Sequence, residues 1–459
     1  MDIQLTNTLG RKKETLKPIR EGQVGIYTCG PTVYDRASIG NLRSFTFADV
    51  LRRTLEAAGN KVTMVMNITD VGHLTDDASE GEDKLELASR KTGSTAWDIA
   101  ARYTELFIAD MKKLNLRTPE VMPKATDHIP EQIAMIEAIE KAGYTYIIAD
   151  GVYFDTTKLE NYGQLSGQKL DEKEGGARVD IGDKHHAADF ALWKFSPDGE
   201  KRHMEWESPW GKGFPGWHIE CSAMSEKYLG VPFDIHTGGI DHIAVHHENE
   251  IAQTLAARGV MEANVWLHNE FLQVDGGKMG KSLGNAYSLD DLAEHGIEPL
   301  AYRLFILGAH YRSPINFTWE SVGAAQNAFA KLREACRELP KPAAEADAAT
   351  MERFMAAMAD DLNTPEALAE FWMTLNSAME PSKKSATLLA MDEVLGLAIE
   401  DVIARPLVIP EAVQKLMAER ETVRAAKDWD HADELRDAIA QLGFVVEDTP
   451  DGQKVKELR

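Results

Sequence analysis

The sequence predicts an α/β protein built on a parallel sheet, and two stretches of the chain indicate this fold. Residues 24–29 and 61–69 are short apolar runs typical of buried strands, and apolar residues recur at helical spacing across residues 39–58 between them. A strand, a helix and a strand of these lengths form a βαβ unit, in which the two strands lie parallel. The same alternation returns over residues 215–271. We therefore expect one sheet with strands from both stretches and with ligands at the carboxyl ends of its strands.

Each element of the second stretch follows from its own pattern. Apolar residues at helical spacing predict helices at 215–228 and 246–257, and short apolar runs predict strands at 233–236 and 265–271. In the first stretch, Gly59 directly follows the predicted helix, as is typical of a helix C-terminus.

With 459 residues the chain is too long for a single core, so we expect several domains. Residues 119–205 mix a helical pattern with strand-like pieces, which indicates an α+β insertion into the sheet domain. From about residue 319 the chain is nearly all helical, interrupted at residues 339–348 and 404–410. The expected division is a sheet domain (1–118 and 206–318), an inserted domain (119–205), a helical bundle (319–403) and a C-terminal module (404–459).

The composition limits which partners and compartments suit this chain. Lysine and arginine number 50 against 74 aspartates and glutamates, a formal net charge of −24. This charge argues against a non-specific nucleic-acid binder but leaves room for local basic patches. The three cysteines lie far apart in the sequence, so we expect no disulfide scaffold and a reducing compartment. We find neither a secretory signal nor an apolar run long enough to cross a bilayer, and therefore expect a cytoplasmic protein with no membrane partner.

Residues 38–41, Ser-Ile-Gly-Asn, lie between a predicted strand and the start of the first predicted helix. Backbone N–H groups and the helix dipole favour a phosphate at such a position, and Gly40 would let a nucleotide approach the backbone closely. Alternatively, Ser38 is only the N-cap of this helix, since serine is a preferred capping residue.

Residues 278–282, Lys-Met-Gly-Lys-Ser, follow an Asp-Gly-Gly sequence in a glycine-rich loop. The two lysines of such a loop, Lys278 and Lys281, can fold over a polyphosphate and neutralise charge as a leaving group departs. The alternative is a solvated surface loop, which is the commoner role of a charged run.

Four side chains form a candidate metal-ligand set. His246 and Glu250 are four residues apart, so on a helix both project from one face. Cys29 ends the first predicted strand, and Cys221 lies on or near the helix predicted at 215–228. Two thiolates, an imidazole and a carboxylate suit a zinc ion. Spacing alone does not bring the four together, and the alternative is that the cysteines are buried small hydrophobes and the other two a polar helix face.

Together and in this order, the segments resemble the class I aminoacyl-tRNA synthetases, and among them the cysteine-specific family. Residues 38–41 correspond to the first class I signature, written HIGH, and residues 278–282 to the second, written KMSKS. The resemblance covers essentially the whole chain. The other matching segments are Thr28–Asp35, Asn67–Asp70, Gly216–Met224, His246–Gln253, Lys427–Asp433 and Leu442–Asp448.

The resemblance implies an enzyme that joins L-cysteine to tRNA(Cys), using ATP with Mg²⁺ and forming cysteinyl-adenylate. We expect it to be a monomer, although the sequence alone does not fix the oligomeric state. The sheet domain would be a Rossmann-like catalytic domain, the insertion a connective domain, and the C-terminal module an anticodon-binding module. One zinc ion per chain would be bound by Cys29, Cys221, His246 and Glu250, and would also bind the substrate thiolate. Because a metal–thiolate contact separates cysteine from serine better than pocket shape does, no editing site is expected.

The resemblance also assigns substrate contacts to positions of this sequence. The residues expected to face the phosphates or stabilise the transition state are Ser38, Asn41, Lys278 and Lys281. Those expected to bind ATP are Gly40, Gly239, Asp241 and Lys281, and those expected to place the amino acid are Gly30, Thr69, Asp70 and Trp217. Those expected to contact the anticodon are Arg424, Trp429, Asp433 and Asp448. Trp429 is alternatively a core aromatic of a small helical module.

Two signature positions depart from the family pattern: Ser38 replaces the first histidine of HIGH, and Gly280 replaces the first serine of KMSKS. We expect an active enzyme with Ser38 as a neutral hydrogen-bond donor, since both lysines and the metal-ligand set are present. Two alternatives stay open: a ligase that transfers cysteine to an amino-sugar, as in the mycothiol pathway, and an inactive zinc- and RNA-binding paralogue. The C-terminal module weighs against the first, and Lys278, Lys281 and Asp241 weigh against the second.

Overall fold

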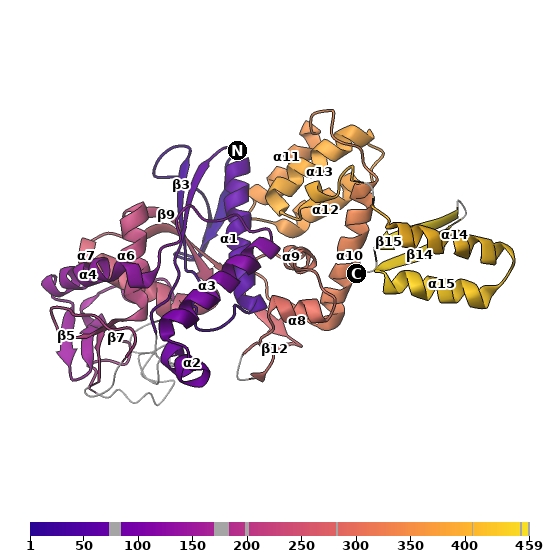
Figure 1. Cartoon of the computed structure of the whole chain (residues 1–459). Coiled ribbons are helices and arrows are strands. Elements are labelled where there is room, and N and C mark those ends of the chain that lie inside the picture. The colour runs from indigo at the N-terminus through magenta and orange to yellow at the C-terminus, as the bar shows by residue number, and fades with distance from the viewer. Residues whose placement is uncertain are drawn as a thin grey trace.

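The computed structural model describes residues 1–72, 84–168, 183–197, 202–280, 283–405, 407–449 and 452–457. Figure 1 shows them as successive parts: the strands of the inserted domain at one end, then the parallel sheet, then the helical bundle and, at the far end, the C-terminal module.

The central sheet has four strands, and every neighbouring pair is parallel. The strand order is β10 (Ala263–Asn269), β9 (Phe233–Gly239), β3 (Gln23–Thr28), β4 (Lys61–Met66). The chain passes from β3 through α1 (Ile39–Ala57) to β4 on one side, and later adds β9 on the other side of β3. The reversal between β3 and β9 is a topological switch point, where open α/β sheets bind ligands. The structure confirms the predicted α/β fold.

Helices cover both faces of this sheet (Figure 1). On one face α1 packs against α3 (Ala96–Lys113), where the rings of Phe45 and Phe107 meet edge to face with centroids 4.9 Å apart. On the other face lie α6 (Trp217–Leu229) and α7 (Glu248–Arg258). Because side chains alternate along a strand, neighbouring residues of β3 point into these two separate cores.

The inserted domain is a four-stranded antiparallel sheet beside α4 (Ile129–Lys141). Its strands, in spatial order, are β5 (Thr145–Ile148), β6 (Gly151–Phe154), β7 (Phe190–Phe195) and β8 (Gly213–Pro215). β8 lies beyond residue 205, the expected end of the inserted domain. α6 starts two residues after the end of β8. The inserted sheet therefore leads directly into a helix of the sheet domain.

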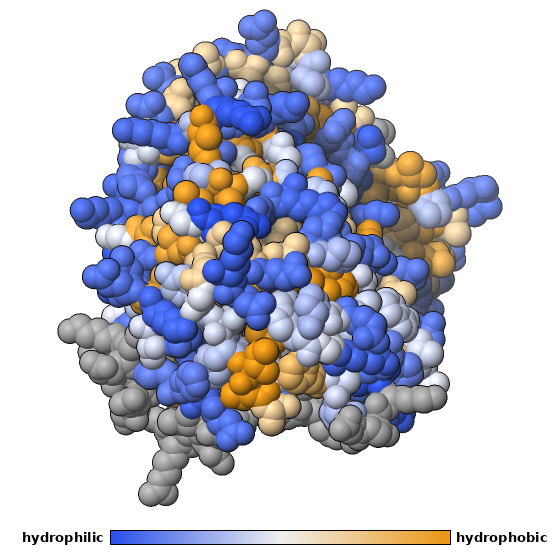
Figure 2. Space-filling model, turned by 90° about the vertical axis from the view of Figure 1, so that its left-hand side faces the viewer, coloured by the Kyte–Doolittle hydropathy of each residue, from blue (hydrophilic) through white to orange (hydrophobic). Residues whose placement is uncertain are grey.

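The molecular surface agrees with the high content of charged residues. On the side of the molecule that carries α4 and β5, hydrophilic side chains predominate and hydrophobic ones are scattered (Figure 2). Within the described ranges of the chain, we find no helix that is both long and apolar enough to cross a membrane.

The rest of the chain consists of short elements around the central sheet and a helical region. The N-terminal hairpin is β1 (Gln4–Asn7) and β2 (Lys12–Thr15), and α2 (Lys84–Thr92) precedes α3. A second small sheet contains β11 (Leu272–Val274), β12 (Gly277–Lys278) and β13 (Ile315–Phe317). The helices are α8 (Leu289–Glu294), α9 (Pro299–Leu307), α10 (Trp319–Arg337), α11 (Ala348–Ala359), α12 (Thr364–Leu375) and α13 (Pro381–Leu395).

The C-terminal module consists of two helices and a hairpin. These are α14 (Glu411–Ala425), α15 (Trp429–Gln441), and the antiparallel strands β14 (Phe444–Thr449) and β15 (Gly452–Glu457). The prediction that this region is nearly all helical is wrong for the hairpin. Gly443 adopts a φ of +84° after α15, and Phe444 and Val446 then alternate into a core with the helix residue Ile439.

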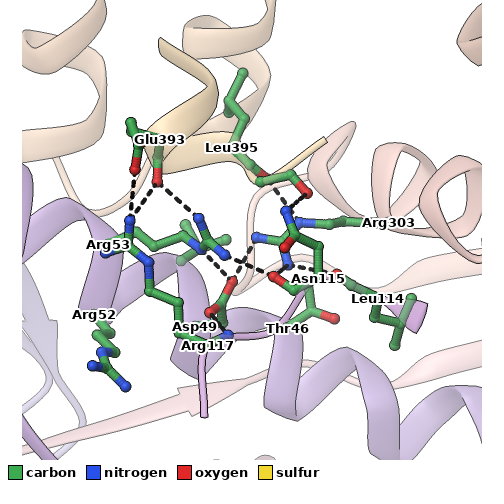
Figure 3. A network of polar contacts seen from close by, with 12 residues as sticks. Thr46, Asp49, Arg52, Arg53, Leu114, Asn115, Arg117, Arg303, Glu393 and Leu395 are labelled. Carbon is green, nitrogen blue, oxygen red and sulfur yellow. Dashed lines mark hydrogen bonds and ion pairs between the residues drawn. The ribbon is translucent and has the colours of Figure 1, made fainter. Parts of the chain in front are cut away.

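A buried ion network joins the sheet domain to the bundle (Figure 3). The Asp49 carboxylate of α1 accepts hydrogen bonds from Arg53 Nε at 2.7 Å and from Arg303 Nη2 at 2.6 Å. Arg303 is fully buried in α9 and also donates to the carbonyl oxygens of Leu114, at 3.0 Å, and Leu395, at 2.7 Å. Burial alone would raise the pKa of Asp49, but the charges of Arg303 and Arg53 hold it below its ordinary value.

Candidate active site

A cavity of about 780 Å³ opens at the carboxyl ends of β3 and β9, at the switch point of the central sheet. Cys29 and Gly30 line it directly after β3, and Gly238 and Gly239 line it at the end of β9. Lys278 of β12 lines it as well. Elements from both sequence stretches therefore enclose one ligand-sized space.

The four predicted metal ligands meet beside this cavity. Cys29 follows β3, Cys221 lies in α6, His246 belongs to a single π-helical turn (Ile243–His247), and Glu250 lies in the first turn of α7. Their ligand atoms all lie within 4.8 Å of one another, and all four side chains are buried. This group could hold a metal ion. The spacing of the four residues in the sequence did not show that they meet.

The separations between the ligand atoms fit a tetrahedral metal centre. With metal–sulfur bonds of about 2.3 Å and metal–nitrogen or metal–oxygen bonds of about 2.0–2.1 Å, neighbouring ligand atoms lie roughly 3.3–3.8 Å apart. Cys29 Sγ and Cys221 Sγ are 3.8 Å apart, and His246 Nε2 is 3.4 Å from Cys221 Sγ. Glu250 Oε1 lies 3.2 Å from His246 Nε2 and 3.8 Å from Cys29 Sγ. The donor set and its spacing both suit zinc.

Histidines that had no role in the sequence-based prediction surround this group. His247 Nε2 lies 3.3 Å from Cys29 Sγ, and His236 Nε2 lies 2.9 Å from Glu250 Oε2. These two histidines form a second potential ligand group with the same cysteine and glutamate. Partners of this kind orient metal ligands and fix their protonation. Two features of the sequence could have pointed to these histidines: His247 directly follows His246, and His236 ends the strand predicted at 233–236.

Burial sets the protonation of these side chains. It raises the pKa of Cys221 to about 11, and it raises the pKa values of Cys29 and Glu250 well above their ordinary values. Burial also lowers the pKa of His236 to about 4. A divalent cation between the four ligand atoms would reverse the effect on the thiols and the carboxyl group, since it favours their anionic forms. Metal binding at this site should therefore release protons.

The N-terminus of α1 borders the same cavity. Gly40 and Asn41 line it, whereas Ser38 is buried as the N-cap and is not among the lining residues. A Cβ atom on Gly40 would lie 2.2 Å from Met279 Cε, so glycine here allows Met279 of the lysine loop to pack against α1. Direct contact between Ser38 and a phosphate stays a prediction.

Several residues predicted to place the amino acid or ATP also line the cavity. They are Gly30, Thr69, Trp217, Gly239 and Asp241. The ring centroid of Trp217 is 4.3 Å from that of His246, so Trp217 forms a wall next to the metal ligands. A Cβ atom on Gly30 would lie 1.6 Å from the Asn67 carbonyl oxygen, so only glycine fits there.

Two further residues were predicted to place the amino acid or to bind ATP, Asp70 and Lys281. The buried Asp70 does not line the cavity, and its carboxylate accepts hydrogen bonds from the Thr126 backbone N–H at 2.9 Å and from Thr126 Oγ1 at 2.7 Å. Asp70 thus fixes the segment that enters the inserted domain. Lys281 lies outside the described residues, and its role stays a prediction.

The predicted anticodon residues lie on the C-terminal module. Arg424 Nη1 is 2.7 Å from Asp448 Oδ2, and the Arg424 guanidinium carbon is 5.6 Å from the ring centroid of Trp429. Trp429 is 56% exposed, which excludes the alternative that it is a core aromatic. Asp433 pairs with Arg436 on the same helix, at 3.0 Å. An exposed tryptophan beside an arginine offers a stacking surface for an unpaired base.

Three sequence profiles match this chain. The profile described as "tRNA synthetases class I (C) catalytic domain" matches residues 15–327, the "DALR domain" matches residues 353–400, and the "Cysteinyl-tRNA ligase anticodon binding domain" matches residues 408–455. Together they extend over most of the chain and follow the order of its structural parts.

Curated proteins resemble the chain along nearly its whole length. "Cysteine–tRNA ligase 1" of Burkholderia lata is 52% identical over 456 residues, covering 99% of this chain and 97% of that protein. "Cysteine–tRNA ligase" of Novosphingobium aromaticivorans is 45% identical, covering 97% and 95%, and one from Thermus thermophilus is 42% identical, covering 99% of each.

Solved structures share the fold at low identity. Mycobacterium tuberculosis methionyl-tRNA synthetase in complex with methionyl-adenylate has a TM-score of 0.54 and 16% identity, over 83% of this chain and 91% of that one. The Agrobacterium radiobacter K84 agnB2 LeuRS–tRNA–LeuAMS complex has a TM-score of 0.57 and 11% identity, over 84% and 85%. Both support the class of fold described above.

Proposed function

The chain belongs to the cysteine–tRNA ligase family of class I aminoacyl-tRNA synthetases, and from this membership we propose how its own residues perform the reaction. The enzyme activates L-cysteine with ATP, with release of pyrophosphate, and transfers the cysteinyl group to the 3′ end of tRNA(Cys). The observation that carries the proposal is the meeting of two thiols, an imidazole and a carboxylate beside the cavity at the switch point.

Cys29, Cys221, His246 and Glu250 hold one zinc ion per chain in this proposal. When bound, zinc supplies a soft acceptor for the substrate thiolate, and a serine hydroxyl is a much poorer ligand at neutral pH. The tetrahedral spacing of the four ligand atoms supports this assignment. Cavity shape alone would separate cysteine from serine by only ~1–3 kcal/mol.

Within the cavity, Gly30 and Thr69 place the amino acid and Trp217 forms the wall beside it, so that the cysteine carboxylate faces the nucleotide. Asp70 contributes indirectly, because its carboxylate binds Thr126 and does not face the cavity. Gly30 keeps the backbone close to Asn67, which leaves the space in front of Cys29 for the substrate.

ATP lies with its phosphates between α1 and the lysine loop, and Mg²⁺ accompanies it. Asn41 and the backbone at Gly40 face the phosphates, and Lys278 and Lys281 balance the charge that develops as pyrophosphate leaves. Gly239 and Asp241 receive the adenosine. The common cavity that Gly40, Asn41, Lys278, Gly239 and Asp241 line supports this placement.

In this proposal the C-terminal module binds the anticodon through Arg424, Trp429, Asp433 and Asp448. The domain boundaries are those expected from the sequence: 1–118 with 206–318, 119–205, 319–403 and 404–459. The profile matches at residues 353–400 and 408–455 support this division. A monomeric enzyme in a reducing compartment stays a prediction. The comparisons give no support to an amino-sugar ligase or an inactive paralogue.

Replacement of Trp429 by alanine should weaken tRNA binding without affecting cysteine activation. Stacking of one base on an aromatic side chain is worth about 1–3 kcal/mol, so the KM for tRNA(Cys) should rise about 10-fold or more. Steady-state aminoacylation measures this KM, and ATP–pyrophosphate exchange measures activation. Trp97→Ala is the matched control, because Trp97 is an exposed tryptophan of α3 outside the module. An unchanged KM for tRNA in Trp429→Ala would remove Trp429 from the anticodon site.

Cysteine-dependent ATP–pyrophosphate exchange and charging of a tRNA(Cys) transcript test the function as a whole. We expect exchange with cysteine to exceed exchange with serine by more than the roughly 200-fold that size discrimination can supply. Transfer to an amino-sugar acceptor is measured in parallel. No exchange from metal-loaded protein, or transfer to the amino-sugar instead of tRNA, would overturn the proposal.

A further inference from the structure

The N-cap of α1 is a capping box, in which Ser38 and Asn41 bind each other. The Ser38 hydroxyl donates to Asn41 Oδ1 at 2.8 Å, and the Ser38 backbone N–H donates to the same oxygen at 3.1 Å. In return, the Asn41 backbone N–H donates to Ser38 Oγ at 3.3 Å. The Asn41 side chain thus accepts two hydrogen bonds, both from Ser38.

These contacts fix which way the Asn41 amide faces. Two donors can be satisfied only by the amide oxygen, so Oδ1 faces Ser38 and the two N–H groups of Nδ2 face away from it. Asn41 is exposed and lines the cavity, whereas Ser38 is only 6% exposed and does not line it. Among the described residues, Nδ2 has no hydrogen-bond partner.

A second donor lies next to this amide. The Ile39 N–H is bound by the Tyr287 carbonyl oxygen at 2.8 Å, and the Asn41 N–H by Ser38. Within the part of the chain that the structure describes, the Gly40 N–H has no partner, and Gly40 also lines the cavity. A neutral amide and a backbone N–H therefore stand at the N-terminus of a 19-residue helix.

The other helices with the same capping arrangement show what is particular about α1. In α3 and α8 the residue three positions after the cap is an aspartate, Asp98 or Asp291, which accepts the N-cap hydrogen bonds with a carboxylate. In α10 it is Ser321, whose hydroxyl oxygen accepts the Thr318 N–H at 3.0 Å and whose O–H donates to the Thr318 carbonyl oxygen at 2.9 Å, back toward the cap. A carboxylate suits a helix N-terminus, because it interacts favourably with the dipole. At α1 it would repel a phosphate, whereas an amide accepts on one side and donates on the other.

We propose that Ser38 is a positioning residue that acts through Asn41. Ser38 holds Oδ1 so that Nδ2 presents its N–H groups to the phosphates of ATP, and the serine itself does not touch them. This inference rests on the proposed function, and it replaces a direct phosphate contact of Ser38 by an indirect one.

A double-mutant cycle tests this role. Ser38→Ala should lower kcat for cysteine-dependent exchange about 10- to 100-fold with little change in the KM for cysteine, since misplacing one catalytic contact has effects of this size. In an Asn41→Ala background the same substitution should change kcat by less than about 2-fold, because no amide remains to be oriented. Ser38→Thr keeps the hydroxyl and should restore most of the activity. Effects that multiply in the double variant would show that Ser38 acts independently of Asn41 and would overturn the inference.

Asn41→Asp provides a second test that leaves Ser38 intact. The carboxylate keeps the capping hydrogen bonds, so the melting temperature should be unchanged or higher, yet kcat should fall at least about 100-fold because both N–H groups are lost. Full activity in this variant would contradict the proposal. Thr95→Ala is the matched control: it breaks the equivalent capping box of α3 and should lower stability as Ser38→Ala does, with kcat unchanged. Absence of exchange in the wild-type enzyme would instead refute the proposed function.

Discussion

Cys221→Ser is expected to remove the metal and nearly all cysteine activation. Bound metal should fall far below one ion per chain, because a serine hydroxyl cannot replace the thiolate among the four ligands. Loss of partners that merely surround a metal costs about 10- to 100-fold in affinity or activity, so loss of a direct ligand should cost at least ~100-fold in cysteine-dependent exchange. Elemental analysis of the purified chain measures the metal independently of activity.

The third cysteine provides the control for this experiment. Cys336 is fully buried in α10, and Cys336→Ala also removes one buried thiol but lies outside the ligand group. It should keep one metal ion per chain and normal exchange, even if its core packing is weaker. If Cys221→Ser bound a full equivalent of metal with normal discrimination against serine, the proposed ligand set would be wrong.

Arg303→Met should destabilise the fold more than any surface substitution. Arg303 and Asp49 form a fully buried pair at 2.6 Å, and removal of the arginine leaves a buried carboxylate with less compensation. Breaking a buried pair from one side costs about 3–5 kcal/mol. The carbonyl oxygens of Leu114 and Leu395 also lose their donor. Urea denaturation of the wild-type and variant chains measures the change in the free energy of unfolding.

An exposed ion pair of the bundle gives the comparison. Arg353 pairs with Glu370 at 2.5 Å, but its side chain is 58% exposed, so Arg353→Met should cost at most about 1 kcal/mol. A double variant with Asp49→Leu and Arg303→Met should be more stable than the sum of the two single effects predicts, since the Asp49 carboxylate and the Arg303 guanidinium are removed together and only Arg53 loses an ionic partner. A loss below about 1 kcal/mol in Arg303→Met would mean that the network contributes little to holding α1, α9 and α13 together.

Local patterns predicted much of the fold because each element carries its own signal. The strands at β3 and β9 and the helix α1 follow from apolar runs and helical spacing, and the parallel sheet follows from their alternation. The β14–β15 hairpin escaped prediction because half or more of the residues in its strands are polar and because their packing partners lie in α14 and α15. Contacts of that kind are a property of the tertiary structure.

The candidate site divides in the same way. The resemblance placed Cys29 and Glu250 in one ligand group. No local spacing could show that the residue after β3 and a residue of α7 lie 3.8 Å apart. The sequence also could not predict the hydrogen-bond partner of Ser38, since its hydroxyl could have faced either the cavity or the helix. The structure directs it to Asn41.

The proposed metal ligands come from both sides of the inserted domain, and this sets when a metal site can form during synthesis. Cys29 and Glu250 are 221 positions apart. At roughly 5–20 residues per second, a growing chain carries the first thiol for about 10–45 s before the carboxylate exists. A nascent chain therefore cannot trap the ion until the intervening domain has been made and the two halves of the sheet have closed around it. In this proposal, ion capture requires both halves of the sheet domain but neither the helical bundle nor the C-terminal module, which follow later in the chain.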